Sequence, residues 1–429
     1  MTTTITRGLS PVRTVIDNGA VVIVQETKTT AAVTINATVR AGGVHESEAL
    51  PGVAYLTSRV LDRGTASRTA DLIAEELDDR GVALRLFPTR HTTAVTCTCL
   101  AEDFEDVLAI VLDVIRNPVF PEEEVAKRRA EVLTALRQDA DNPAVRSTDV
   151  LFEMLYGASH PYGRPAKGTP GGVEGMTRDN LVAFHRERFQ PASLSLAIVG
   201  QVDGHHALEC ATRQLNGWSG HALTEPPLPK AASGAIREQR RVEIPGKAQS
   251  DIAYGFVAID RLDPKFYAYF VMNNILGQFG LGGRLADNIR ERQGMAYYAF
   301  SAFDPSIGPG PLMIRAGVDP ANVERTIAAI DHEVGTLGSG GPTAQELAQS
   351  QQYLIGSLPR TLETNAGIAH FLQNAEIFGL GLDYDQRLPE RIRAVTMDEV
   401  TAAASEVLHP ERAVIAIAGP PAAESVSQV

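Results

Sequence analysis

One short segment, PGVAYLTSRVLDRGT at residues 51–65, has the form of a helix that could carry a metal site. The Pro51-Gly52 pair begins an amphipathic helix, and a glycine ends it. Side chains four residues apart lie on one face of such a helix, so two ligands at that spacing can bind one metal ion. The residues at that spacing are Tyr55 and Arg59, and neither is a usual zinc ligand. The segment therefore has the form of a metal helix without its ligands.

The common catalytic signatures are absent from the rest of the sequence. No His-Glu-x-x-His segment occurs, and His205 and His206 are adjacent rather than four residues apart. No Gly-x-Ser-x-Gly nucleophile segment occurs either. The glycine-rich segment GQFGLGGR, residues 277–284, lacks the Lys and the Ser or Thr that a phosphate-binding loop needs, so it is typical of a loop joining two helices. Local spacing thus provides no set of metal ligands and no nucleophile.

The composition is typical of a globular protein with an acidic surface. The 429 residues carry a formal net charge of −13, which argues against a nucleic-acid partner because phosphate binding needs a basic face. The cysteines, Cys97, Cys99 and Cys210, form no disulfide or zinc-ribbon pattern, and the first two point to the same side of an expected strand. No apolar run approaches the length of about 18 residues that spans a membrane, and the N-terminus lacks the apolar core of a signal peptide. We therefore expect a cytoplasmic protein with no membrane partner.

The chain contains an internal duplication. Residues 176–200, MTRDNLVAFHRERFQPASLSLAIVG, align without a gap with residues 395–419, VTMDEVTAAASEVLHPERAVIAIAG. Both copies read as a Thr that caps a helix, a Pro-marked turn and an apolar strand ending in Gly, and Thr396 with Glu399 forms a capping box. A match over this length predicts a repeat of about two hundred residues.

The duplication divides the chain into two halves. The Pro- and Gly-rich segment 217–235 lies where a linker is needed, so we expect an N-terminal half at 1–216 and a C-terminal half at 236–429. Each half begins with strands, the first with an Asn18-Gly19 hairpin, and continues with long helices. This order predicts an α+β fold of two homologous halves, each a largely antiparallel sheet packed with helices. The expected helices cover 65–81, 103–116 and 121–141 in the first half, and 263–277, 320–337 and 343–358 in the second.

Several segments, taken in order along the chain, resemble the pitrilysin and insulinase family of inverted-motif zinc peptidases. The resemblance is strongest to the short two-half subfamily that includes mitochondrial processing peptidase. AGGVHESEALPGVAYLTSRVLDRGT resembles the family's first sheet strand and metal helix, and NPVFPEEEVAKRRAEVLTALRQDADNP resembles its second metal helix. The match continues through HPYGRPAKGT, FHRERFQPASLSLAIVG, NNILGQFGLGGRLADNIRERQGMAYYAFS and LETNAGIAHFLQN, and it covers nearly the whole chain.

The resemblance implies that the family's metal site is degenerate in this chain. Active members carry His-x-x-Glu-His on the first helix, where two histidines bind zinc and the glutamate is the general base. At those places this sequence has Tyr55, Ser58 and Arg59. The third ligand position, a Glu in the family, falls on Ala135 by alignment through the DNP segment at 141–143. We therefore expect no metal and no cofactor in this chain.

The resemblance also implies that a second element of the family's site is retained. The family has an arginine and a tyrosine seven residues apart, opposite the zinc across an internal chamber, and Arg290 and Tyr297 have this spacing. We expect Arg290 in the last turns of a helix that ends near Gly294, and Tyr297 on the following strand. A phenol and a guanidinium can donate hydrogen bonds to a peptide backbone and to an oxyanion. Without the resemblance, the two residues read as a solvated arginine and a sheet tyrosine.

The resemblance then implies a function shared between two chains. This chain is expected to be the non-catalytic Arg/Tyr subunit of a heterodimeric zinc peptidase, with zinc in a homologous His-x-x-Glu-His partner and unfolded peptide as substrate. Two alternatives stay open, a structural scaffold subunit of a larger complex and a stand-alone peptide-binding protein. The retained Arg/Tyr pair argues against a pure scaffold. Further candidates for substrate contact lie in the glycine-rich segment: Gly280, Gly282 and Gly283.

Overall fold

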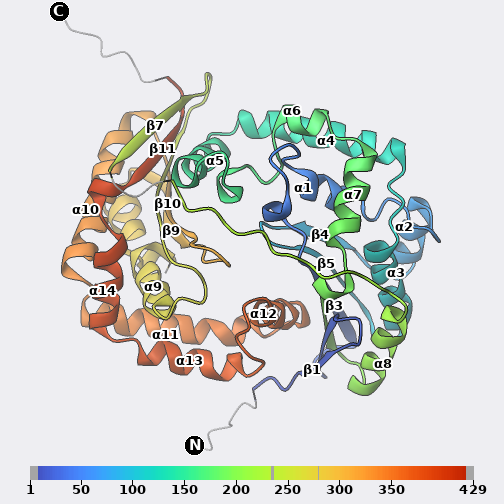
Figure 1. The fold of residues 1–429 in the computed structure, drawn as a ribbon. Coiled ribbons are helices and arrows are strands. Elements are labelled where there is room, and N and C mark those ends of the chain that lie inside the picture. The colour runs from blue at the N-terminus through green and yellow to red at the C-terminus, as the bar shows by residue number, and fades with distance from the viewer. Residues whose placement is uncertain (1–7, 233–235, 279, 422–429) are drawn as a thin grey trace, which may run out of the picture. The chain divides into compact units, whose positions relative to one another are not determined.

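The computed structural model describes residues 8–232, 236–278 and 280–421, and the chain forms two compact units. The expectations for the first seven residues and for residues 233–235 of the linker lie outside the described residues. Each unit has its own sheet and its own hydrophobic core, and Figure 1 gives the path of the chain. The first unit contains Met1–Leu136, Pro165–Pro227 and Leu358–Arg387, and the second contains Arg137–Arg164, Leu228–Ser357 and Leu388–Val429.

The first unit is built on a six-stranded mixed sheet with the strand order β1-β2-β6-β3-β5-β4. β2 and β6 are parallel, and the four other neighbouring pairs are antiparallel. The hairpin predicted at Asn18-Gly19 joins β1 to β2, and Gly19 has a φ of 89°, which residues with a side chain rarely adopt. The strands are β1 (Val12–Val15), β2 (Val21–Glu26), β3 (Ala32–Val39), β4 (Arg85–Pro88), β5 (Thr93–Leu100) and β6 (Leu194–Gly200).

The second unit repeats this sheet with five strands in the order β7-β11-β8-β10-β9. β11 and β7 are parallel, and the remaining pairs are antiparallel. When β1 is left aside, each strand has a counterpart at the same place in the first sheet. The α+β class with two homologous halves is therefore confirmed. The strands are β7 (Glu238–Glu243), β8 (Ser250–Val257), β9 (Ala296–Phe303), β10 (Pro311–Val318) and β11 (Val414–Gly419).

The two segments that align in the sequence also fold alike. The hydroxyl of Thr177 accepts a hydrogen bond from the backbone at the start of α7 (Arg178–Arg188), and Thr396 does the same for α14 (Met397–Val407). The carboxylate of Glu399 accepts from the backbone N of Thr396 at 2.8 Å, which completes the predicted capping box. A Pro-initiated 3-10 turn and then β6 or β11 follow each helix.

Most of the predicted helices are present, but one boundary was wrong. The helix expected at 65–81 is α2 (Ala70–Asp78), because Thr65 bridges to Pro118 and Thr69 caps the helix. The other predicted helices are α3 (Phe104–Arg116), α4 (Glu122–Ala140), α9 (Phe266–Asn273) with the π-helix η5 (Asn274–Gln278), α10 (Val323–Gly340) and α11 (Ala344–Thr361). The remaining helices are α1 (Val53–Val60), α5 (Pro143–Tyr156), α6 (Pro170–Glu174), α8 (Gly204–Leu215), the π-helix η7 (Ala286–Arg292), α12 (Asn365–Ile377) and α13 (Tyr384–Ala394).

Each unit takes one helix from a sequence region that lies in the other predicted half. In the first unit α12 packs on β3 and β6, and Gln373 donates to the backbone O of Asn36 at 2.7 Å and of Ser195 at 2.9 Å. In the second unit α5 packs on β8 and β11, and the backbone O of Ala144 accepts from Arg315 at 2.9 Å (Figure 1). These helices cover the sheet faces that the other helices leave open, so β3, β6, β8 and β11 are almost entirely buried.

Candidate functional site

The helix expected from the sequence to be a degenerate metal helix, α1, is held in the first unit by its cap and its apolar face. Gly52 precedes it with a φ of 95°, and a side chain there would meet the backbone O of Lys167 at 2.5 Å. The carboxylate of Glu46 accepts from the backbone N of Gly52 and of Ala54, each at 2.9 Å, and so satisfies two free donors at the helix start. The apolar face of α1 is part of the first core. The packing role that the sequence predicts for this helix is confirmed.

At the expected ligand positions, Ser58 is bonded to its own helix and Arg59 makes a long, half-exposed ion pair. Ser58, at the place of the general base, is buried, and its hydroxyl donates to the backbone O of Tyr55 at 2.7 Å. Arg59 lies 3.9 Å from the carboxylate of Glu131 on α4. Ala135 is also on α4, one turn after Glu131. The structure thus brings α1 and α4 together as the family resemblance implies, with an ion pair in place of ligands.

An open pocket of about 390 Å³ lies beside these residues, between α1 and the edge strand β4. Burial raises the pKa of Asp62 in this pocket, and the neighbouring Arg63 partly opposes the shift. Three arginines and one aspartate repel a divalent cation more than they attract it, and the donor set contains no histidine. The residues present do not fit a zinc ion. The pocket is lined by Ser58, Arg59, Asp62, Arg63 and Leu84 through Phe87.

The Arg/Tyr pair lies in the second unit, on adjoining elements. Arg290 is on η7, which ends at Arg292, two residues before Gly294 with its φ of 60°. The backbone N of Met295 donates back to the O of Ile289. Tyr297 follows on β9, the edge strand of the second sheet, and η7 packs on β9. These placements agree with the expectation for a helix end and a following strand.

Both members of the pair are accessible. Tyr297 is 82% exposed, and its hydroxyl forms no hydrogen bond with the residues that the structure describes. The Arg290 side chain is 46% exposed and forms an ion pair with the adjacent Glu291 at 3.6 Å. By contrast, the next tyrosine, Tyr298, points to the other side of the strand and its hydroxyl donates to Asp251. The exposed hydroxyl and guanidinium are therefore free to donate to a bound peptide.

The two ends of the glycine-rich segment before η7 lie against each other and against β9, too close for side chains. A side chain on Gly283 would meet the Cα of Gly277 at 2.9 Å, and one on Gly277 would meet the backbone N of Ser301 in β9 at 2.5 Å. Gly280 has a φ of 59°, and the space around its missing side chain is open. The segment is thus a loop packed against β9, the strand of Tyr297. Gly280 and Gly282 are exposed, and Gly283 is buried.

Arg284, the last residue of the glycine-rich segment, anchors this loop to α11. Arg284 donates to both carboxylate oxygens of Glu346, at 2.6 Å and 2.9 Å. Burial raises the pKa of Glu346, but hydrogen bonds from Arg284 and Thr343 outweigh it and bring the pKa to about 2. Thr343 and Glu346 also form a capping box at the start of α11. This box was readable in the sequence, whereas its bond to Arg284 was not.

Two family descriptions match the chain. Residues 21–165 match the insulinase family, peptidase family M16, and residues 175–354 match the peptidase M16 inactive domain. With the strand order and the α1–α4 arrangement, these matches identify the chain as a member of the M16 (insulinase) peptidase family. The resemblance read from the sequence is confirmed at the level of the family.

Relatives of similar length share this fold. A protein of Streptomyces coelicolor described as a zinc protease is 26% identical, and the match covers 95% of this chain and 89% of that protein. One of Mycobacterium tuberculosis H37Rv, also described as a zinc protease, is 27% identical, and the match covers 93% of this chain and 91% of that protein. The crystal structure of a peptidase M16 inactive domain from Pseudomonas fluorescens has a TM-score of 0.90 and 25% identity, and covers 97% of this chain and 99% of that one. A protease from Helicobacter pylori is 17% identical and shares the fold with a TM-score of 0.88. The match covers 96% of this chain and 100% of that one.

A membrane-spanning helix is not among the elements described. None of the helices in residues 8–232, 236–278 and 280–421 combines the length and the apolar character needed to cross a bilayer.

The free cysteines Cys97 and Cys99 are buried on β5, and burial raises the pKa of Cys97 to about 12 and of Cys99 to about 11. Both belong to the first hydrophobic core, and a raised thiol pKa disfavours the reactive thiolate.

Proposed function

We propose that this chain is the non-catalytic Arg/Tyr subunit of a heterodimeric M16 peptidase. In this proposal a homologous chain with His-x-x-Glu-His supplies the zinc, and Arg290 and Tyr297 of this chain contact the unfolded peptide substrate. The observation that carries the proposal is the accessible Tyr297 hydroxyl on an edge strand against which η7, the helix of Arg290, packs. The retained Arg290 and Tyr297 together argue against a pure scaffold, which needs neither residue.

The state of the former metal site supports the assignment of zinc to a partner. Ser58 donates to its own helix, Arg59 pairs with Glu131, and Ala135 has no ligand atom. Nothing at these positions can bind the ion or activate water. The zinc-protease descriptions of the relatives support zinc chemistry in the family, and in this proposal that chemistry belongs to the partner.

The chemistry assigned to this chain is positioning and charge stabilisation. Attack on a peptide bond produces negative charge on the carbonyl oxygen, and a donor aimed at that oxygen lowers the barrier. Tyr297 is assigned this donation. Arg290 is assigned hydrogen bonds to the peptide backbone, for which its planar guanidinium is suited. Backbone contact with the peptide is assigned to the exposed Gly280 and Gly282, with Gly283 at the base of the loop. The proposal also includes a cytoplasmic location.

The test is complementation with the homologous His-x-x-Glu-His chain. We expect this chain alone to hydrolyse no peptide, and the mixture to hydrolyse an unstructured fluorogenic peptide but not a folded domain of the same composition. The matched control is the partner with Gln in place of the Glu of its motif, which should be inactive in the mixture. A partner that is fully active alone, with no gain on mixing, would leave the complementation idea without support and favour the scaffold. Saturable peptide binding by this chain alone would instead favour the stand-alone binding protein.

A further inference from the structure

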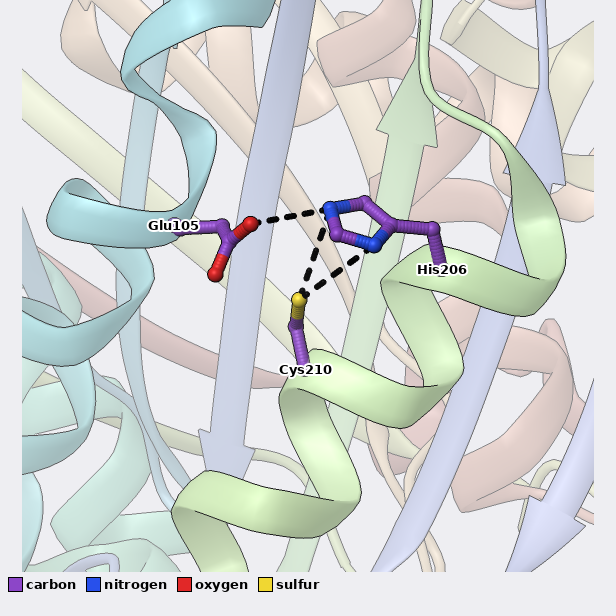
Figure 2. Close-up of side chains that lie close together, drawn as sticks. All are labelled: Glu105, His206 and Cys210. Carbon is purple, nitrogen blue, oxygen red and sulfur yellow. Dashed lines mark hydrogen bonds and ion pairs between the residues drawn. The ribbon is translucent and has the colours of Figure 1, made fainter.

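Three side chains that metal ions favour meet on the first unit, where α3 begins and α8 runs past it (Figure 2). Glu105 is in the first turn of α3, and His206 and Cys210 are four residues apart on one face of α8. Their ligand atoms all lie within 4.8 Å of one another. His206 Nε2 is 3.0 Å from Glu105 Oε1 and 3.6 Å from Cys210 Sγ.

The helices that carry these residues are fixed by packing. Ala207, Ala211 and Leu215 place one side of α8 in the first core, and Cys210 itself is buried there. Asp203 caps the helix, because its carboxylate accepts from the backbone N of His206 at 2.8 Å. The positions of the backbone on both helices are therefore set without any bound ion, and only the side chains of Glu105 and His206, about half exposed, need to adjust.

The distances match those between ligands of a tetrahedral zinc ion. With Zn–N and Zn–O bonds of about 2.1 Å and a Zn–S bond of about 2.3 Å, nitrogen lies about 3.4 Å from oxygen and about 3.6 Å from sulfur. The observed 3.0 Å and 3.6 Å are close to these values. We propose that Glu105, His206 and Cys210 bind one divalent transition-metal ion of the zinc type, with a solvent-accessible fourth position.

The charges and donor types agree with this ion. A thiolate and a carboxylate together balance a charge of +2, and a thiolate with an imidazole selects zinc or cobalt over magnesium or calcium. Arg213 does not take the place of the ion, because it donates to the other oxygen of Glu105, Oε2, at 2.7 Å. An outer hydrogen bond of this kind fixes the orientation of a ligating carboxylate. The same nitrogen, Nη2, also lies 3.5 Å from Cys210 Sγ, and in this proposal it gives up the sulfur contact and keeps the shorter bond to Glu105 when an ion binds.

This site is separate from the degenerate one, since α3 and α8 carry it rather than α1 and α4. The expectation that local spacing provides no metal ligands rested on pairs of histidines, whereas His206 and Cys210 have helical spacing and the third candidate, Glu105, comes from elsewhere in the chain. Zinc found on the purified chain is then assigned to Cys210. Such a finding would leave the proposed heterodimer function untouched. The metal proposal is tested by metal binding to this chain, and the heterodimer proposal by peptide hydrolysis after mixing, so the failure of one does not imply the failure of the other.

The test is titration of the chelator-stripped full chain with Co²⁺ and then with Zn²⁺. We expect one Co²⁺ per chain, with the near-ultraviolet absorption of a cobalt–thiolate bond, and displacement of the cobalt by Zn²⁺. Cys210→Ser should abolish this absorption and weaken binding at least about 100-fold, and His206→Gln should weaken binding similarly, since loss of even an outer partner costs about 10- to 100-fold. The matched control is His205→Gln on the same helix, an exposed residue 3.5 Å from Glu209, which should bind as the wild type does.

Two results would overturn the proposal. One is the absence of stoichiometric Co²⁺ or Zn²⁺ binding, which would leave the three residues as an ion-pair and hydrogen-bond network. The other is stoichiometric binding without the thiolate absorption, or binding that His206→Gln leaves unchanged, which would place the ion elsewhere. Cys210 is buried, so Cys210→Ser could fail to fold. His206 is half exposed, and His206→Gln then provides the test by itself. Circular dichroism confirms the fold of each variant.

Discussion

The region of α1, α4 and β4 in the first unit and the region of η7, β9 and α11 in the second both place arginines beside the edge strand of a sheet, but they hold them differently. In the first, Arg59 pairs with Glu131 and Arg63 with Asp62. In the second, Arg284 is locked to Glu346, while Arg290 and Tyr297 remain accessible. The ion pairs of Arg59 and Arg290 are alike in length and exposure, so the clear contrasts are the locked Arg284 and the exposed Tyr297 of the second unit.

The difference shows how one repeated strand arrangement can hold polar groups at its edge in two ways. Apart from β1, the strand order is the same in both units. What differs is the state of one hydroxyl, because that of Ser58 is bonded to its own helix, whereas that of Tyr297 is exposed. A group that is already hydrogen-bonded must give up that bond to meet a ligand, whereas an open group gives up only bonds to water.

The largest expected effect is that of Tyr297→Phe in the assembled heterodimer. If this hydroxyl donates to the developing oxyanion, kcat should fall by about 10²-fold while peptide affinity changes little. Steady-state kinetics measures both, and size-exclusion chromatography confirms assembly. The matched control is Tyr298→Phe, whose hydroxyl binds Asp251 on the other side of the strand and should leave kcat unchanged. Wild-type rates in an intact Tyr297→Phe heterodimer would make this unit as inert as the first one.

The next effect is that of Arg290→Ala. Loss of hydrogen bonds from a charged group to the peptide backbone should raise KM by about 10-fold and lower kcat as well, because ground-state and transition-state binding are both lost. The control is Arg292→Ala, two residues along η7, which pairs with Asp287 at 2.8 Å. Equal losses in both variants would show that the charge of this helix matters and not the Arg290 position.

A smaller effect is expected on stability from Glu346→Gln. The folded-state pKa of about 2 lies below the ordinary value, so the ionised pair stabilises the fold above about pH 4 and this contribution is lost as the pH falls toward 2. Denaturant unfolding of the full chain at pH 7 should show a loss of about 2 kcal/mol, a large part of the 3 kcal/mol or so that this pKa shift allows. The difference from wild type should shrink below about pH 4. The exposed Glu363→Gln serves as control, and an unchanged variant at pH 7 would contradict the anchor.

The smallest effect is expected from Arg59→Ala at the former metal site. Its ion pair with Glu131 is long, at 3.9 Å, and both side chains are nearly half exposed. Such a pair is worth at most about 0.5 kcal/mol in the free energy of unfolding. Activity of the heterodimer should change less than about two-fold, since surface substitutions away from a site are nearly neutral. A loss of activity comparable to that of Arg290→Ala would return α1 to the working site and end the contrast between the two units.

Local chemistry in the sequence determined the repeated elements of the fold. The Thr396–Glu399 capping box, the Asn18-Gly19 hairpin and the helix end at Gly294 were all predicted, because each depends on residues a few positions apart. The loss of ligand types at Tyr55, Ser58, Arg59 and Ala135 is likewise a property of the sequence. The family followed from the order of these segments and not from any one of them.

Tertiary structure decided which side chains meet. The bond of Arg284 to Glu346, the pair of Arg59 with Glu131 and the approach of Glu105 to His206 join residues 62, 72 and about 100 positions apart. The late start of α2 and the packing of α5 and α12 on their sheets also depend on distant partners. Such contacts follow from burial and packing of whole elements, which no local pattern encodes. The sequence therefore determined which groups are available, and the fold decided which of them are bound to the protein and which stand open to a peptide or a metal ion.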